Sequence, residues 1–254
     1  MTPVNPLDLS GKTVVVTGAS SGIGRATAEL LSQLGARLVL VARNRDALEA
    51  TFGRLSGDGH QVFDYDLTLL DGIPDLIWRI HESVGRIDGL VHSAGLHSIR
   101  PLRSIEPEDI HRLFDINVAS AVMLVKGFRH KKVRGSDASV VLLSSAVGQV
   151  GQSGVSVYSA SKGAVLTLAK SLALELAREN VRVNAVCPGV VVTEMTDELR
   201  RAIGPESFES VENAHPLGLG RAEDVANSVA FLLSDAARWI TGSALTVDGG
   251  YTAQ

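Results

Sequence analysis

A tyrosine and a lysine four positions apart, Tyr158 and Lys162, give the strongest chemical signal in the sequence. They stand at the start of a helix expected over 158–178, so their side chains share one helix face. An ammonium group beside a phenol favours the phenolate and lowers the phenol's pKa from its usual ~10. The pair is therefore suited to general acid–base chemistry near neutral pH.

Ser145 precedes this pair and ends an expected apolar strand. Ligands of open parallel sheets bind at the carboxyl ends of the strands, so its hydroxyl is placed where a substrate would lie. By chance, however, a tyrosine and a lysine four apart on a helix are usually surface neighbours. The interpretation therefore depends on the elements that hold these side chains.

Short β-branched runs alternate with longer stretches of helical spacing along the chain. Strands are expected over Thr13–Thr17, Arg37–Ala42, Gln61–Tyr65, Ile87–His92, Ser139–Ser144, Arg182–Cys187 and Ala244–Val247. Helices are expected over Ile23–Leu34, Asp46–Leu55, Asp75–Val84, Tyr158–Arg178 and Ala222–Leu233. Most strands are continuously apolar, as in strands covered on both faces. The alternation predicts an α/β fold, a single-domain Rossmann-type doubly wound parallel sheet of about seven strands with helices on both faces.

Composition excludes several classes of protein. The 254 residues are 45% hydrophobic and 20% charged, which excludes an intrinsically disordered chain. Lys and Arg number 24 against 28 Asp and Glu, so the positive excess typical of nucleic-acid-binding domains is missing. No apolar run approaches the ~18 residues of a membrane span. Met1 to Ser10 lacks the features of a secretory signal, and the single cysteine, Cys187, cannot form an internal disulfide. We expect a cytoplasmic protein that binds neither nucleic acid nor membrane.

Three glycines, Gly18, Gly22 and Gly24, follow the first expected strand and open the first helix. Glycine permits a tight turn and lets the backbone approach a pyrophosphate, which the helix N-terminus favours. The predicted cofactor contacts of this loop are Gly18, Ser20, Ser21, Gly22, Ile23 and Gly24. The loop also matches the G-x-S-x-G pattern of serine hydrolases, with Ser20 as the nucleophile. No acid and histidine are tied to Ser20 by spacing, so we disfavour a hydrolase.

The end of the second strand indicates which nucleotide binds. An NAD site usually has Asp or Glu about 20 residues past the glycines to hold the ribose 2′-hydroxyl. That place is taken by Ala42, and Arg43 follows it. A guanidinium group pairs with a 2′-phosphate. We therefore predict NADP(H) with contacts at Arg43 and Asn44, and keep NAD(H) as the alternative in which this arginine is merely solvated.

Taken in order, the motifs resemble those of the short-chain dehydrogenase/reductase family over nearly the whole chain. The matching segments are Thr17–Gly24, Phe114–Val118 around Asn117, Ser145, Tyr158–Lys162, Pro188–Thr193 and Leu245–Gly250. The resemblance implies that Tyr158 protonates a substrate carbonyl, or deprotonates the alcohol in the reverse direction. Ser145 would bond the same oxygen, and Lys162 would hold the nicotinamide ribose. Asn117 would hold a water that relays protons to Lys162.

The resemblance also implies further cofactor contacts. These are Asp66 and Leu67 at the adenine, Ser93, Ala94 and Gly95 along the adenosine ribose, and Pro188, Gly189, Val191 and Thr193 near the nicotinamide. One departure is His92, where the family usually has asparagine; we expect a packed, hydrogen-bonded imidazole there. The pocket is expected to form from residues 96–103 and 147–155 together with Glu194 to Gly220. That last segment is either a substrate lid or an irregular connection.

The substrate implied by the resemblance is a small ketone or secondary alcohol. The chain also resembles 3-oxoacyl-carrier-protein reductases, which dock an acidic carrier partly through basic residues on helices. One such position is Leu174 here, and the basic segment 129–134 also reads as a solvated helix end. A carrier-bound substrate is therefore an alternative, as are an NAD-dependent alcohol dehydrogenase and a non-catalytic nucleotide-binding scaffold. The resemblance further implies a homotetramer paired through the helix at 158–178 and the C-terminal strand.

Overall fold

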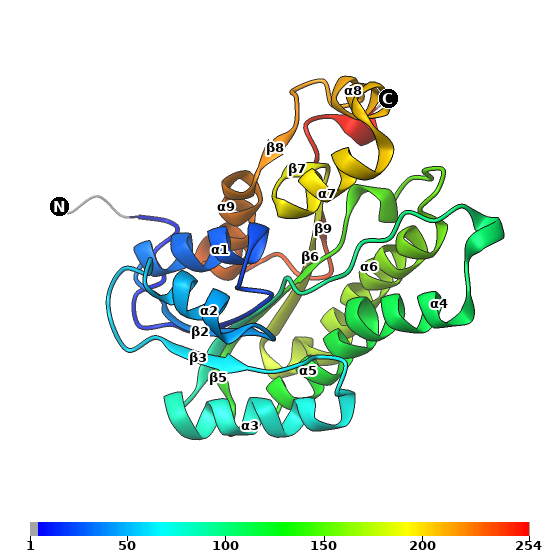
Figure 1. Cartoon of the computed structure of the whole chain (residues 1–254). Coiled ribbons are helices and arrows are strands. Elements are labelled where there is room, and N and C mark those ends of the chain that lie inside the picture. Colours follow the sequence, from blue (N-terminus) through cyan, green and yellow to red (C-terminus); the bar gives the residue numbers. More distant parts are fainter. Residues whose placement is uncertain (1–4, 254) are drawn as a thin grey trace.

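A seven-stranded parallel sheet forms the middle layer of the computed structural model (Figure 1). The structure describes residues 5–253. The expectation that the N-terminus is not a secretory signal depends partly on Met1 to Val4, which lie outside the described residues. The strand order is β3-β2-β1-β4-β5-β6-β9. The strands are β1 (Thr13–Thr17), β2 (Arg37–Ala42), β3 (Gln61–Asp64), β4 (Ile87–His92), β5 (Arg134–Leu143), β6 (Val181–Pro188) and β9 (Ala244–Val247).

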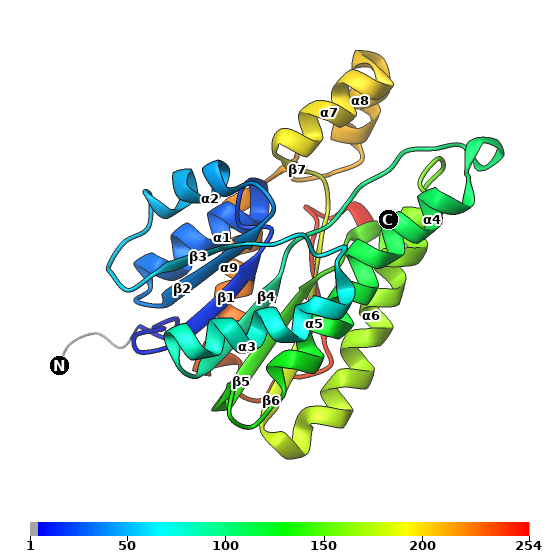
Figure 2. The ribbon, with the colours of Figure 1, turned by 60° about the horizontal axis from the view of Figure 1, so that its bottom comes forward.

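Helices cover both faces of the sheet, which Figures 1 and 2 show from two directions. One face carries α1 (Gly22–Gln33), α2 (Arg45–Phe52) and α9 (Ala222–Leu233). The other carries α3 (Ile73–Val84), α4 (Pro107–Phe114), α5 (Ser120–Phe128) and α6 (Ser156–Leu176). The predicted α/β fold with a doubly wound parallel sheet is confirmed.

The buried strands supply two hydrophobic cores, one on each face. Successive side chains of a strand point to opposite faces. In β1, Val14 and Val16 accordingly pack in the core beneath α1 and α9, whereas Val15 packs in the core beneath α3 and α5. All three valines are at most 1% exposed. This two-sided burial explains why β1 reads as one continuous apolar run.

From β1 the chain builds the sheet outward in one direction with β2 and β3, and then returns to add β4, β5 and β6 on the other side of β1. The neighbours β1 and β4 are hydrogen-bonded to each other. Open α/β sheets bind ligands in the crevice beyond the carboxyl ends of strands at such a switch point. Gly18 follows β1 directly, and Ser93 follows β4. The fold therefore brings the glycine loop and the Ser93–Gly95 segment together.

The strand β5 begins earlier than predicted, at Arg134 instead of Ser139, because its first residue pairs with Ile87 of β4 across a register shift. A ten-residue strand spans roughly 33 Å. The basic segment 129–134 therefore lies at the amino end of β5, whereas Ser145 follows its carboxyl end. Arg129 and Arg134 both pair with Glu179 there, at 2.6 and 3.5 Å.

The segment from Glu194 to Gly220 is mostly helical. It contains α7 (Glu194–Ile203) and α8 (Pro205–Asn213), which extend beyond the carboxyl edge of the sheet in Figure 2. A short parallel pair, β7 (Val191–Val192) with β8 (Gly220–Arg221), joins the two ends of this segment. An irregular connection is therefore the wrong description. Within residues 5–253, no helix is both long and apolar enough to span a membrane.

Candidate active site

A cleft of about 370 Å³ runs along the carboxyl edge of the sheet, from the glycine loop to Tyr158 and Lys162. The predicted cofactor residues that line it are Gly18, Ser20, Ser21, Gly22, Ile23, Gly24, Arg43, Asn44, Leu67, Ser93, Ala94, Gly95, Tyr158, Lys162, Pro188 and Thr193. Gly189 and Val191 line an adjoining cavity instead. Asp66 lines neither, although it stands next to Leu67.

Glycine is required at two places in the loop after β1. Gly18 adopts a φ of +68°, and a Cβ there would lie 2.7 Å from the backbone nitrogen of Ala94. A Cβ on Gly24 would lie 2.2 Å from the carbonyl oxygen of Gly18. The helix α1 starts directly behind this loop, with no side-chain cap at Ser21 and no acidic residue in its first turn. The uncapped N–H groups and the helix dipole fit a pyrophosphate.

The loop after β2 presents one unpaired guanidinium to the cleft. Arg43 is exposed, lines the cleft and forms no ion pair within residues 5–253. Arg45, by contrast, pairs with Glu49 at 3.0 Å and Asp64 at 2.9 Å. Asn44 has a structural task, because its side-chain oxygen accepts the N–H of Ala47 and caps α2. Arg43 is therefore the cation available to a ligand in this loop.

Asn117 lies in a π-helical turn, Asp115–Ala119, between α4 and α5. Its Oδ1 accepts the Leu96 N–H at 2.9 Å, while its Nδ2 donates to the Leu96 carbonyl at 3.1 Å and to Ser161 Oγ at 2.9 Å. Local π-helical widening is frequent at functional sites. Here it lets one buried amide connect the loop after β4 to α6.

Ser145, Tyr158 and Lys162 come together where β5 ends against the start of α6. Ser145 precedes a short 3-10 turn, Ala146–Gly148. A Cβ on Gly148 would lie 2.8 Å from the backbone of Lys162, so glycine permits this close approach. Ser145 and Tyr158 line the same cavity, and the Ser145 side chain is close enough to influence the pKa of the phenol. The structure thus brings the three predicted side chains to one place.

The electrostatics of this group differ from expectation. Burial raises the pKa of Tyr158 to about 12, and the Ser145 side chain opposes that rise. Burial lowers the pKa of Lys162 to about 8. The expected lowering of the phenol's pKa by Lys162 is wrong for this geometry. The physical reason is that the ammonium donates to the Leu143 carbonyl at 2.9 Å, while the phenol is withdrawn from water.

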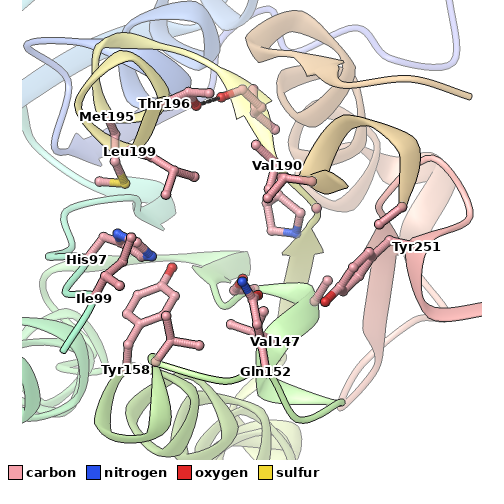
Figure 3. Close-up of a pocket in the computed structure, with 18 of the residues that line it drawn as sticks. His97, Ile99, Val147, Gln152, Tyr158, Val190, Met195, Thr196, Leu199 and Tyr251 are labelled. Atoms are coloured by element: carbon pink, nitrogen blue, oxygen red, sulfur yellow. Dashed lines mark hydrogen bonds between the residues drawn. The ribbon is translucent and has the colours of Figure 1, made fainter. Parts of the chain in front are cut away.

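A second cavity, of about 520 Å³, opens above Tyr158 (Figure 3). Ser145 and Tyr158 line it, together with residues of the loops after β4 and β5, as predicted. His97, Gln152, Met195 and Leu199 of its lining fall within the predicted pocket segments, although none was named for a role there, whereas Tyr251 lies outside those segments. The loop residues His97 and Gln152 have no periodic pattern that would mark them. Tyr251 follows the C-terminal Gly249-Gly250 motif, which was the only signal for it.

His92 is the packed, hydrogen-bonded imidazole that was expected. Ser120 donates its hydroxyl to the Ile116 carbonyl at 2.6 Å, so its oxygen accepts the His92 Nε2–H at 3.1 Å. The Thr17 hydroxyl then donates to Nδ1 at 2.9 Å. Burial, followed by the charge of Lys162, lowers the pKa of His92 to about 3. His92 is therefore a neutral structural link between β1, β4 and α5.

Cys187 is fully buried in β6, as expected of a small apolar side chain. No group of three or more His, Cys, Asp or Glu side chains suited to a metal ion occurs in the described part of the chain.

Comparison with known proteins agrees with this geometry. Residues 18–252 match the family model described as Enoyl-(Acyl carrier protein) reductase. The human 3-oxoacyl-[acyl-carrier-protein] reductase is 36% identical over 240 residues, covering 94% of this chain and 97% of that protein. A short-chain type dehydrogenase/reductase from Mycobacterium marinum has a TM-score of 0.90 at 31% identity, covering 98% of both chains.

A second solved structure carries a nucleotide. It is a protein of Agrobacterium tumefaciens, provisionally assigned as a 2-deoxy-d-gluconate 3-dehydrogenase, with bound NADP. It matches with a TM-score of 0.87 at 29% identity, covering 99% of this chain and 100% of that one. From the fold, the site and these matches, the chain belongs to the short-chain dehydrogenase/reductase family of oxidoreductases.

Proposed function

We propose that the protein is an NADP(H)-dependent oxidoreductase that interconverts a ketone and its secondary alcohol, with Tyr158 as the general acid and base. One observation carries the proposal: Tyr158 lines both the cleft that begins at the glycine loop and the adjoining cavity. A group at this junction can act on a substrate while a nucleotide occupies the cleft. The nicotinamide, when bound, would supply or accept the hydride.

The chain's own residues handle the proton and the oxygen. Ser145 donates a hydrogen bond to the carbonyl oxygen and stabilises its developing negative charge. A phenol with a pKa of about 12 is protonated at neutral pH, so Tyr158 can give its proton to that oxygen. Lys162 would hold the ribose hydroxyls of a bound nucleotide, and its ammonium lies 5.9 Å from the centroid of the Tyr158 ring. Asn117 fixes the loop after β4 to α6, and we assign it the water that relays protons to Lys162.

The preference for NADP(H) rests on Arg43. It lines the cleft, and its guanidinium is not paired with any carboxylate in residues 5–253. A 2′-phosphate would gain a charge-assisted contact there. The bound NADP of the Agrobacterium relative fits this proposal. An NAD-dependent alcohol dehydrogenase is the alternative, and it requires that Arg43 contribute nothing to nucleotide binding.

We favour a free small molecule over a carrier-bound substrate. The human relative is named for a carrier-bound substrate, which keeps 3-oxoacyl reduction as the second candidate. The basic segment 129–134, however, leads into β5 at the end of the strand opposite the active site. The position in α6 where a carrier-docking arginine would stand is Leu174, which is 82% exposed. Neither region offers a cationic surface beside the cavity.

The oligomeric state, the location and the lid stay predictions. We propose a cytoplasmic homotetramer paired through α6 and the C-terminal strand region, where Leu174 and Trp239 are 82% and 91% exposed. Light scattering that finds only monomers would contradict it.

We also propose that α7 and α8 form the substrate lid of a single domain over 1–254. The helix α7 supplies Met195 and Leu199 to the cavity wall.

The function is tested with purified protein, NADPH and a broad panel of ketones, following NADPH absorbance, and with NADP⁺ and the matching alcohols. We expect turnover of several ketones. If the protein binds NADPH but converts no ketone or alcohol, the proposed activity is wrong and a nucleotide-binding scaffold is favoured.

A further inference from the structure

We propose that the substrate is an uncharged, largely apolar ketone with a hydroxyl on the carbon next to its carbonyl, and that His97 recognises this hydroxyl. The inference rests on the proposed carbonyl reduction at Tyr158 and names the substrate class of that site. Three features of the cavity carry it: the charge of its lining, the partners of its two histidines, and the character of its remaining walls.

The lining of the cavity carries no formal charge. Among the described residues that line it, none is Asp, Glu, Lys or Arg. A carboxylate or phosphate that entered would lose its water without gaining a cation, which is strongly unfavourable. The nearest lysine of the site, Lys162, is buried and donates to the Leu143 carbonyl. A substrate that carries its own anionic group therefore does not fit this cavity.

Two histidines line the cavity, and one of them is fully engaged with the protein. His215 Nδ1 donates to the Val211 carbonyl at 2.7 Å, and its Nε2 accepts the Val190 N–H at 3.1 Å. Its ring also stacks on Tyr251 with centroids 4.9 Å apart. His215 thus fixes the wall of the cavity and has no ring nitrogen left for a ligand.

His97 is the opposite case. Its ring meets the Tyr158 ring edge-on, with centroids 4.7 Å apart, and neither ring nitrogen is hydrogen-bonded to any of residues 5–253. In Figure 3 the imidazole lies beside the Tyr158 hydroxyl, and both face the interior of the cavity. Partly buried polar nitrogens without a protein partner favour a ligand that supplies one.

The state of His97 selects the kind of group it binds. Burial, followed by the charge of Lys162, lowers the pKa of His97 below its usual 6.5, so the ring is neutral at neutral pH. A neutral imidazole has one donor nitrogen and one acceptor nitrogen. A hydroxyl matches either nitrogen. Because the imidazole lies beside the phenol that bonds the carbonyl oxygen, the hydroxyl belongs on the neighbouring carbon.

Most of the remaining wall is apolar. Ile99 and Val147 come from the loops after β4 and β5, and Val190 from the short link between β6 and β7. Met195, Leu199 and Ile203 come from α7. An alkyl or aromatic substituent on the ketone gains free energy by leaving water in such surroundings. The rest of the substrate therefore meets mainly apolar side chains, with Gln152, Ser207 and Ser210 among the polar exceptions.

The experiment compares matched substrates in the wild-type protein and three variants. Acetophenone and α-hydroxyacetophenone differ in the hydroxyl, while methyl para-acetylbenzoate and para-acetylbenzoate differ in charge. We expect wild-type kcat/KM to be about 10-fold higher for α-hydroxyacetophenone than for acetophenone. It should likewise be about 10-fold higher for methyl para-acetylbenzoate than for para-acetylbenzoate. His97→Leu should abolish the preference for α-hydroxyacetophenone, and His97→Gln should retain part of it. Ser98→Ala, next to His97 but outside the cavity lining, is the control and should keep the wild-type preference.

Each outcome has a distinct meaning, provided that NADPH binding shows each variant to be folded. A His97→Leu protein that retains the wild-type ratio of kcat/KM for the two acetophenones would overturn the role of His97. Equal kcat/KM for the ester and the carboxylate would overturn the uncharged substrate class. Failure of every ketone with every variant would instead contradict the proposed function itself.

Discussion

The Lys162 ammonium donates a hydrogen bond of 2.9 Å to the Leu143 carbonyl, at the last residue of β5. This bond ties α6 to the strand end from which Ser145 follows two residues later. The same nitrogen lies 5.9 Å from the centroid of the Tyr158 ring. One buried lysine thus holds the helix that carries the phenol against the strand end that carries the serine.

Replacing Arg43 should change nucleotide preference. In Arg43→Ala we expect the Kd for NADPH to rise about 10- to 100-fold, because a charge-assisted contact to the 2′-phosphate is lost. The Kd for NADH, which lacks that phosphate, should stay within about 3-fold of the wild-type value. Titration of protein fluorescence with each nucleotide measures both constants.

Arg45→Ala is the matched control for this measurement. Its guanidinium is already paired with Glu49 and Asp64, so both nucleotides should bind as they do to the wild type. If Arg43→Ala binds NADPH with wild-type affinity, Arg43 is a solvated surface residue. The search for substrates would then begin with NAD and alcohols.

A methyl group at Gly24 should damage the glycine loop. Its Cβ would lie 2.2 Å from the Gly18 carbonyl oxygen, so the backbone of the loop must move. We expect Gly24→Ala to lower the free energy of unfolding by about 1–3 kcal/mol. NADPH affinity should fall as well, because the loop would no longer follow the pyrophosphate.

Gly53→Ala provides the control, since its Cβ would approach nothing closer than 3.6 Å, at the Glu49 carbonyl oxygen. Its free energy of unfolding, measured by urea denaturation, should change by less than about 1 kcal/mol. A Gly24→Ala protein with unchanged stability and unchanged NADPH affinity would show that the loop tolerates a side chain, against the geometry described above.

His92 should make the fold sensitive to mild acid. Its pKa is lowered to about 3 in the folded state, so between pH 6.5 and 3 the unfolded chain binds the proton and the folded chain does not. Stability therefore falls as pH decreases through this range, by about 2 kcal/mol between pH 7 and 5 from this group alone. Urea denaturation at the two pH values measures the loss.

His92→Asn should remove this part of the acid sensitivity, since asparagine does not titrate. His111→Asn, at an exposed position of α4, should leave the pH dependence of the wild type intact. An equally steep loss of stability between pH 7 and 5 in His92→Asn would show that other groups cause the acid sensitivity.

The sequence predicted the sheet well because its strands are buried on both faces. Four strands, β1, β2, β4 and β9, have the bounds expected from their apolar runs. The start of β5 was missed because Ser136 and Asp137 are exposed and polar, although the strand continues through them. The helices α7 and α8 were missed because their many charged residues and their glycine and proline resemble a loop.

The placement of the proposed catalytic residues was predictable because their spacing along the chain is fixed by local elements. Tyr158 and Lys162 belong to one helix, and Ser145 follows a strand end. The partners of these groups were not predictable. The hydrogen bond from Lys162 to Leu143 and the contact between His97 and Tyr158 depend on side-chain directions that arise only from tertiary packing.

The most direct test of Tyr158 as the proton donor is the kcat/KM of ketone reduction by Tyr158→Phe, with NADPH affinity measured on the same preparation. Phenylalanine keeps the ring and removes only the hydroxyl, which is the proposed proton donor. We predict a loss of ~100-fold or more in kcat/KM, with a Kd for NADPH within about 3-fold of the wild type. Reduction at the wild-type rate would contradict the assignment of Tyr158 as the general acid.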